Sequence, residues 1–186
     1  MLYYYQENAE DSIMNDVQRR SKEKIIDLEI YTDGSLKKMG TQMTFGAWGF
    51  IVVQDGKEIY EASGSEYNTT NQRMELEAIV QALNYIITIR RPNERIMIYS
   101  DSAYAINCYL QEWYVKWQEN GWVNSKKENV ANRDQWQKII PYFDNFWYTF
   151  SKVPAHSNIF WNEKCDKMVQ EVAERMKFEW RGEKHD

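Results

Sequence analysis

The hydrophobic periodicity of this chain changes near Arg73, and that change constrains the fold more than any other feature of the sequence. Ahead of it, three segments show the two-residue alternation or the aromatic and β-branched content of strands: residues 28–32, 45–53 and 57–63. The turn dipeptide Asp55-Gly56 separates the last two and indicates a hairpin. This part of the chain is therefore predicted to form an antiparallel meander.

After Arg73 the apolar residues recur at helical spacing, and helices and strands then alternate. We expect a helix from 73 to 91, a strand at 95–99, a helix at 103–117 that ends before Gly121, a helix at 132–143, a strand at 146–153 and a helix at 159–178. This order predicts an α/β fold, with a five-stranded mixed sheet flanked by helices. Its first three strands are antiparallel.

The chain has 186 residues and 43% hydrophobic content, enough for one substantial core. Residues 28–179 are predicted to form a single domain. Residues 1–27 carry charge but little apolar periodicity, so we interpret them as an N-terminal extension of unknown role. Residues 180–186 form a polar tail, and its His185 is expected to be idle.

Composition also narrows the function. A formal net charge of −5 does not favour nucleic-acid binding over the whole surface, because phosphate binding depends on Lys and Arg. Such binding would need a local patch. No apolar run reaches membrane-spanning length and the start lacks a signal-peptide pattern, so we expect a cytoplasmic protein with no membrane contact. Cys108 and Cys165 are too few for a disulfide framework or a zinc site.

Four acids stand where a core-facing or capping residue is expected: Asp33, Glu75, Asp101 and Asp166. Each has an ordinary explanation, respectively a turn with Gly34, a favourable charge in a first helical turn, a helix cap and a residue on the shoulder of a helix. Four such acids on four elements are less probable by accident. If they converge, their mutual repulsion requires a cation, which predicts bound divalent metal.

The motifs around these acids identify a family. In order along the chain they are Thr-Asp-Gly-Ser, Thr-Thr-Asn-Gln-Arg-Met-Glu-Leu, Ser-Asp-Ser-Ala-Tyr, Trp-x-x-x-Trp with a later Gly-Trp, and Asn-Glu-Lys-Cys-Asp. Over about Leu28 to Phe178 the chain resembles type 1 ribonuclease H, whose members cleave the RNA strand of RNA/DNA hybrids. The resemblance implies a hydrolase acting as a monomer and leaving 3′-hydroxyl and 5′-phosphate ends.

The resemblance also implies roles for the acids. Two Mg²⁺ ions, which Mn²⁺ can replace, would be held by Asp33 on both ions, by Glu75 and Asp101 on the leaving-group side and by Asp166 on the side of the attacking water. His156 matches a mobile family histidine that assists proton transfer or product departure. Its loop lacks the glycines that many members have. Asn162 matches a residue near the same metal pair.

The same resemblance implies how the hybrid is bound. Gly34, Ser35, Asn71 and Gln72 match positions that line its minor groove, where a 2′-hydroxyl marks the RNA strand. A phosphate pocket for the DNA strand would use Thr70 and Asn132, although Asn68 stands where some members have a basic residue.

Trp113 and Trp117 would pack at the base of a protruding helix-loop beside the DNA strand, although core packing is the ordinary role of such a pair. Here Gln118, Glu119 and Asn120 replace a basic run of the family, which predicts weaker and more salt-sensitive binding.

Two other functions remain open from the sequence. An integrase or transposase would share the fold and use a smaller acidic set for DNA strand transfer. A catalytically silent module would bind hybrid without cleaving it. The context of Glu75 and the presence of His156 argue against strand transfer, and the complete set of four acids argues against a silent module.

Overall fold

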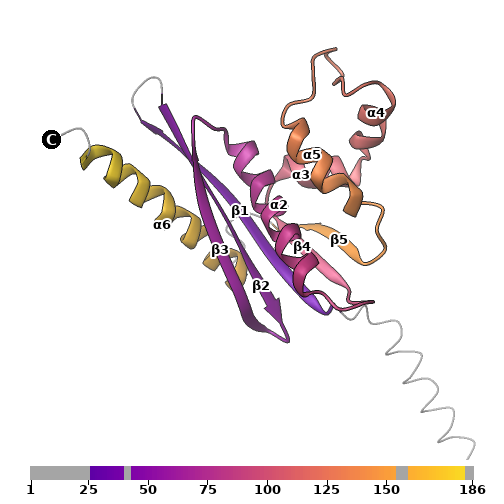
Figure 1. Cartoon of the computed structure of the whole chain (residues 1–186), viewed down its shortest axis with the longest axis horizontal. Helices are drawn as coiled ribbons and strands as arrows, with labels where there is room; N and C mark the ends of the chain where they lie inside the picture. Colours follow the sequence, from indigo (N-terminus) through magenta and orange to yellow (C-terminus); the bar gives the residue numbers. More distant parts are fainter. Residues whose placement is uncertain (1–25, 40–42, 154–158, 183–186) are drawn as a thin grey trace, which may run out of the picture.

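A computed structural model describes residues 26–39, 43–153 and 159–182. Its elements are β1 (Leu28–Met39), β2 (Met43–Gln54), β3 (Lys57–Tyr67), α2 (Asn71–Ile89), β4 (Ile96–Ser100), α3 (Ala103–Leu110), α4 (Trp113–Glu119), α5 (Arg133–Ile139), the 3₁₀ turn η1 (Ile140–Tyr142), β5 (Tyr148–Lys152) and α6 (Phe160–Gly182). The strands form one mixed sheet in the order β3-β2-β1-β4-β5 (Figure 1). The predicted fold class is confirmed.

The β2–β3 hairpin turns where the sequence predicts it. Asp55 and Gly56 both have positive φ, 51° and 70°, as a two-residue hairpin turn of the favoured hand requires. β1, β2 and β3 pair antiparallel, whereas β4 pairs parallel to both β1 and β5. The sheet therefore joins a meander to a pair of crossover strands.

β1 is much longer than predicted, and this corrects the expected position of Asp33. The strand does not end at Thr32 but continues to Met39, because Gly34 to Met39 pair antiparallel with β2. The parallel pairing with β4 does stop at Thr32, which faces Ser100. Asp33 therefore lies in the middle of a strand, at the level where its parallel neighbour ends.

The helices cover the sheet unequally (Figure 1). α2 packs on one face, where Leu76, Ile79 and Leu83 join the main core, and α3, α4 and α5 extend that layer. α6 lies along the other face, where Cys165, Val169 and Ala173 meet β1 and β2. Cys108 and Cys165 are both buried free thiols.

Two expected helices are divided. The predicted helix at 103–117 breaks between α3 and α4, because Glu112 has a left-handed backbone with φ of 51° that an α-helix cannot include. The helix predicted at 132–143 ends as an α-helix at Ile139 and tightens into the 3₁₀ turn η1, which contains Pro141. Within the described residues, every helix is too short or too polar to cross a membrane.

Candidate active site

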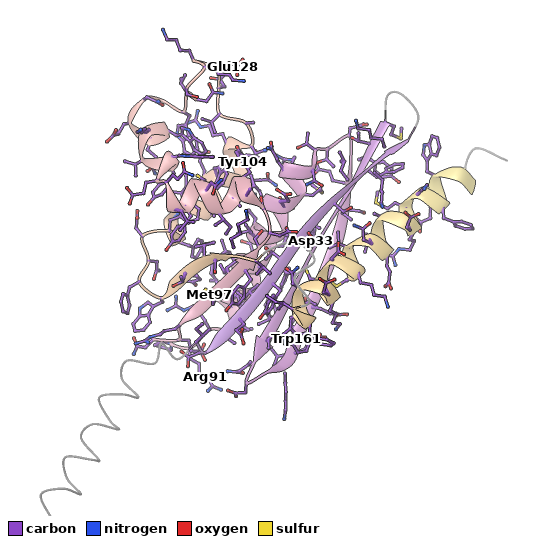
Figure 2. The ribbon with its side chains drawn as sticks, turned by 180° about the vertical axis from the view of Figure 1, so that it is seen from behind. Asp33, Arg91, Met97, Tyr104, Glu128 and Trp161 are labelled. Atoms are coloured by element: carbon purple, nitrogen blue, oxygen red, sulfur yellow. The ribbon has the colours of Figure 1, made fainter. Side chains whose placement is uncertain are left out.

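The structure brings the four predicted acids together at one cavity of about 330 Å³. It lies where the middle of β1, the first two turns of α2, the end of β4 and the first half of α6 meet, and Asp33 is labelled there in Figure 2. Its lining residues are Asp33, Gly34, Ser35, Leu36, Lys37, Asn71, Glu75, Asp101, Asn162, Glu163, Asp166 and Gln170.

Asp33 has the most perturbed carboxyl group of the cavity. Its pKa is raised from 3.8 to about 8, first by burial and then by the nearby charges of Asp101, Asp166 and Glu75, and a hydrogen bond from the Gly34 backbone only partly offsets this rise. The four acids are therefore close enough to repel one another. The raised pKa of Asp33 thus indicates that the four acids lie close together.

At Gly34 the backbone of α2 comes very close to β1. A Cβ atom added there would lie 2.3 Å from the backbone nitrogen of Glu75 and 2.5 Å from the carbonyl carbon of Met74. No L side chain fits this contact without moving backbone. The Asp33-Gly34 pair is therefore no turn, since its glycine lets the N-terminal part of α2 carry Glu75 up to the sheet. The expected first-turn position of Glu75 is wrong, because α2 begins at Asn71, two residues earlier than predicted, and Glu75 lies beyond its first turn.

Two side chains hold the carboxylate of Glu75. Ser102 donates to Oε2 at 2.5 Å, and Asn71 donates to Oε1 at 2.7 Å. These hydrogen bonds lower the pKa of Glu75, but burial, with help from Asp101, raises it above its ordinary value. Ser102 is also the N-cap of α3, because its Oγ accepts from the backbone N–H of Ala105. The N-cap thus follows Asp101 by one residue.

Asp166 and Asn162 come from α6 and lie one helical turn apart. Asn162 is buried, with 6% of its surface exposed, and both residues line the cavity. Gln170, one turn further on, is within 3.4 Å of Asp166 Oδ1 through its amide nitrogen. The same helix thus presents Asp166 between two amide side chains.

The donor set fits a hard divalent cation. Among the described residues, no three Asp, Glu, His or Cys side chains lie close enough together in this structure to hold a metal ion. The acids instead share a cavity and raise the pKa of Asp33. A divalent cation between them would offset that repulsion, and carboxylate oxygens are the ligands that Mg²⁺ and Mn²⁺ prefer.

A second cavity of about 790 Å³ opens beside the first and contains other predicted binding residues. Gln72 lies at one side of it, next in sequence to Asn71 of the acidic cavity. Trp113 lines it and is partly buried, whereas Lys116 and Lys126 line it and are exposed. Trp117 also lines it but is only 8% exposed and belongs to the core, so the two predicted tryptophans differ in their surroundings.

Thr70 and Asn132 lie outside both cavities, at the N-termini of α2 and α5. The Thr70 hydroxyl accepts from the backbone N–H of Arg73 and caps α2. Asn132 precedes α5 with a left-handed backbone, φ of 56°, and makes no side-chain cap. Each of these predicted phosphate contacts therefore stands at a helix start, where backbone N–H groups favour anions.

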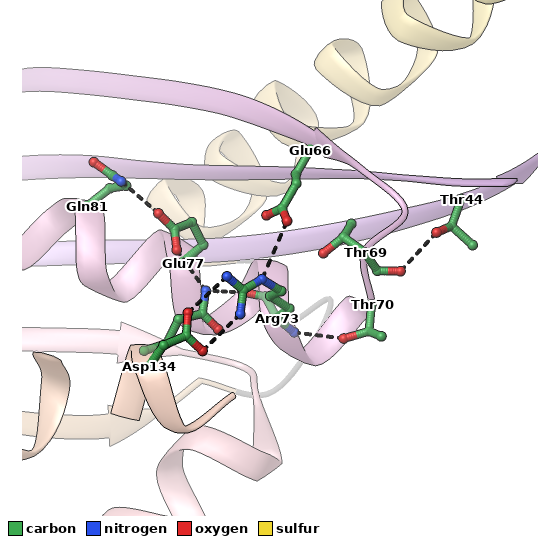
Figure 3. A network of polar contacts seen from close by, with 9 residues as sticks. Thr44, Glu66, Thr69, Thr70, Arg73, Glu77, Gln81 and Asp134 are labelled. Atoms are coloured by element: carbon green, nitrogen blue, oxygen red, sulfur yellow. Dashed lines mark hydrogen bonds and ion pairs between the residues drawn. The ribbon is translucent and has the colours of Figure 1, made fainter. Parts of the chain in front are cut away.

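A polar network that the sequence analysis missed ties those two helix starts together (Figure 3). Arg73 forms a two-pronged pair with Asp134, with N–O distances of 3.1 and 3.0 Å, and also approaches Glu66 at 3.5 Å. The fully buried Gln135 donates to the Arg73 carbonyl and to Glu77. The network fixes α5 against α2.

His156, the predicted proton-transfer residue, lies outside the described residues. Three residues with a role at or near the site were not predicted from the sequence: Ser102, which binds Glu75, Lys37, which lines the acidic cavity, and Gln135, which belongs to the network between α2 and α5. Ser102 had a visible signal in Ser-Asp-Ser, although the pattern did not indicate which residue would cap the helix. Nothing in the sequence pointed to Gln135 or Lys37.

Comparisons with known proteins agree with this geometry. The ribonuclease H family model matches residues 26–174. The ribonuclease H of Syntrophomonas wolfei is 43% identical over 141 residues, which cover 76% of this chain and 92% of that enzyme. The ribonuclease H of Acetivibrio thermocellus is 39% identical over 142 residues, or 76% of this chain and 91% of that enzyme.

Solved structures share the fold at lower identity. LC9-RNase H1, described as a type 1 enzyme with a type 2 active-site motif, superposes with a TM-score of 0.65 at 22% identity, covering 78% of this chain and 71% of that one. The PFV RNase H domain gives 0.66 at 21% identity, covering 79% and 94%. LC11-RNase H1, solved with an RNA/DNA hybrid, gives 0.58 at 20% identity, covering 80% and 98%. Together with the family match and the closer relatives, this shows that the chain belongs to the ribonuclease H family of endoribonucleases.

Proposed function

We propose that residues 28–179 form a catalytic domain that hydrolyses the RNA strand of RNA/DNA hybrids, cutting within the strand and leaving 3′-hydroxyl and 5′-phosphate ends. The observation that carries this proposal is the meeting of four carboxylates from four elements at one cavity of a ribonuclease H fold. One relative of this fold, LC11-RNase H1, was solved with such a hybrid bound.

Asp33, Glu75, Asp101 and Asp166 would hold two Mg²⁺ ions, or Mn²⁺ in their place. The chemistry that such a pair supplies when bound is activation of a water on one side of the scissile phosphate and charge stabilisation of the leaving oxygen on the other. Asp33 would serve both sides, Glu75 and Asp101 the leaving-group side, and Asp166 the side of the water.

The remaining residues orient these acids. Ser102 and Asn71 each donate to one oxygen of Glu75, which keeps that carboxylate in one rotamer and favours its charged form. Asn162 and Gln170 flank Asp166 on its helix and line the same cavity. His156 would assist proton transfer or product departure.

Recognition of the hybrid would follow the two cavities. Gly34, Ser35, Asn71 and Asn162 line the acidic cavity, and Gln72 lines its neighbour, so a minor groove lying across them would present 2′-hydroxyls to polar groups. For the DNA strand, Thr70 and Asn132 would bind a phosphate, and Trp113 with Trp117 would support the surface that carries Lys116 and Lys126. Among the described residues that line the second cavity, Lys116 and Lys126 are the two cations, which supports weak, salt-sensitive binding.

One assay tests the proposal. A labelled RNA/DNA hybrid, an RNA duplex and a DNA duplex are each incubated with Mg²⁺ or Mn²⁺, using the wild-type chain and Asp101→Asn. We expect cleavage of the hybrid RNA strand alone, and its loss in the variant by about 100-fold or more. Cleavage or joining of the DNA duplex would indicate strand transfer, and binding without cleavage would indicate a silent module. Either result would overturn the proposal.

A further inference from the structure

The acidic cavity has a cationic residue at its edge. Five carboxylates line the cavity, and among the described lining residues Lys37 is the one with a positive side chain. Lys37 belongs to β1, four residues beyond Asp33. Because side chains on a strand alternate, Asp33, Ser35 and Lys37 share one side of β1, the side that faces α6. A cation thus stands on the same strand face as the central acid.

α6 carries a matching row of side chains. Asp166, Gln170 and Glu174 are spaced four residues apart and so lie along one side of the helix. Lys37 pairs with Glu174 at 3.5 Å, while Asp166 raises the pKa of Asp33. The four residues from Asp33 to Lys37 span about 13 Å along the strand, and the eight residues from Asp166 to Glu174 span about 12 Å along the helix. The two rows therefore have nearly the same length. The cavity lies along these rows, and we call its part from the acids to Lys37 the track; it is about 13 Å long, the span of four strand residues.

The pair between Lys37 and Glu174 is weakly held. Its N–O distance is 3.5 Å and 57% of the Glu174 side chain is exposed. Glu174 also approaches a second cation, Lys177, at 3.7 Å. Ion pairs so exposed contribute little to stability, so Lys37 can exchange this partner for another anion at small cost.

We propose that Lys37 binds a phosphate of the RNA strand at the far end of this track, giving up Glu174 to do so. The inference rests on the proposed function and names a contact of the same site. Five carboxylates line the cavity, so two bound divalent cations would still leave one negative charge there, and the neighbouring RNA backbone needs a cation of its own. Lys37 can supply this cation, because it lines the same cavity four residues beyond Asp33 and so lies away from the acids that would hold the metal ions.

Binding in Ca²⁺, without Mg²⁺ or Mn²⁺, tests this contact apart from catalysis. The affinity of a fluorescent RNA/DNA hybrid is measured by anisotropy from low to moderate salt for the full-length wild type, Lys37→Met, Lys37→Arg and Glu174→Gln. Lys38→Met is the matched control, because Lys38 is exposed and lies on the opposite side of β1.

We expect Lys37→Met to raise Kd about five- to tenfold at low salt and to reduce the slope of log K against log salt by about one. Lys37→Arg keeps the slope. Glu174→Gln lowers Kd, because it frees the ammonium group. The Lys38 variant changes Kd but leaves the slope closer to wild type than Lys37→Met does. A structural ion pair would instead make Lys37→Met and Glu174→Gln change Kd in the same direction.

Three results would overturn the proposal: an unchanged slope in Lys37→Met, equal effects of the Lys37 and Lys38 variants, or parallel effects of Lys37→Met and Glu174→Gln. If the wild type binds hybrid with the expected slope change but does not cleave it in Mg²⁺, the proposed function fails while the Lys37 contact stands. If it cleaves hybrid and the slope is unchanged, the function stands and the contact fails.

Discussion

Ser102 donates a hydrogen bond of 2.5 Å to Oε2 of Glu75 while its own oxygen accepts from the first turn of α3. One hydroxyl group therefore links the carboxylate on α2 to the start of a helix that follows β4. This link also lowers the pKa of Glu75 against the opposing effect of burial. Glu75 is therefore held by the residue that follows Asp101 in the chain.

Replacing Ser102 by Ala should lower kcat/KM about tenfold and move the acidic limb of the pH profile to higher pH. The reason is that the pKa of Glu75 rises further once the hydroxyl is gone. Loss of the N-cap also costs about 1 kcal/mol of unfolding free energy. Ser102→Thr, which keeps the hydroxyl, should restore the pH profile. An acidic limb that stays in place in Ser102→Ala would contradict this role.

Gly34→Ala should remove activity and destabilise the fold by roughly 1–3 kcal/mol, because the new methyl group would meet the backbone of Glu75 at 2.3 Å. Gly56→Ala is the control. Gly56 has a positive φ of 70° but no neighbour within 4 Å, so its variant should lose about 1 kcal/mol and keep full activity. Urea unfolding and hybrid cleavage on both variants measure the difference, and an active Gly34→Ala enzyme would refute the close-contact argument.

The stability of the metal-free protein should depend on Asp33. Its pKa is about 8 in the folded chain against 3.8 ordinarily, so the folded state keeps a proton that the unfolded state releases. This contribution to stability is fully present below about pH 4 and is lost as pH rises towards 8 and beyond. In a chelator, the unfolding free energy of Asp33→Asn relative to that of wild type should therefore rise between about pH 4 and pH 8, by up to about 6 kcal/mol for a shift of about four pKa units. A gap that does not vary with pH in urea titrations would count against the buried acid cluster.

Replacing Trp113 and Trp117 by Ala, one at a time, should have different effects on stability and on hybrid binding. Trp117 is 8% exposed and packs on Trp122 and Trp136, so its loss should cost about 3–5 kcal/mol of unfolding free energy. Trp113 is less buried and lines the second cavity, so its loss should weaken hybrid binding several-fold with a smaller effect on stability. Thermal unfolding and anisotropy on the two variants compare them, and equal losses of stability would show that both are core residues.

Gln135→Met should destabilise the protein by about 2 kcal/mol, because the Arg73 carbonyl and Glu77 each lose a buried donor, now at 2.9 and 2.7 Å. Gln137→Met on the same helix is exposed and should change the unfolding free energy by less than about 0.5 kcal/mol. Denaturant unfolding distinguishes the two. Equal effects would mean that the network between α2 and α5 does not stabilise the fold.

Periodicity predicted the order of the elements because apolar residues at two- or 3.6-residue spacing must face a core. The Asp55-Gly56 hairpin was equally predictable, since that dipeptide adopts the positive φ angles of the turn. Local pattern did not predict the length of β1. Its second half, Gly34 to Met39, has little strand character and is extended because β2 pairs with it. The break at Glu112 also has no signal, because glutamate ordinarily favours a helix.

The candidate site divides in the same way. The four acids could be found because each interrupts an apolar or capping pattern, and the motifs around them identify the family. Gln135 and Lys37 could not, since a Gln on a helix and a Lys in a strand are ordinary, and Ser-Asp-Ser indicated a helix cap without showing that Ser102 would be the capping residue or would bind Glu75. Their importance arises from partners distant in the chain, Arg73, Glu174 and Glu75 respectively.

The continuity of β1 has a consequence for substrate length. One uninterrupted strand carries both Asp33 and Lys37, so the spacing between the cut and the phosphate contact is set by strand geometry, at about 13 Å. An RNA strand must continue past the cut to reach both. Hybrids trimmed until they no longer reach Lys37 should be cut with the same efficiency by wild type and Lys37→Met, whereas longer hybrids should favour the wild type. The length of β1 between Asp33 and Lys37 would then set the shortest RNA strand that benefits from the Lys37 contact.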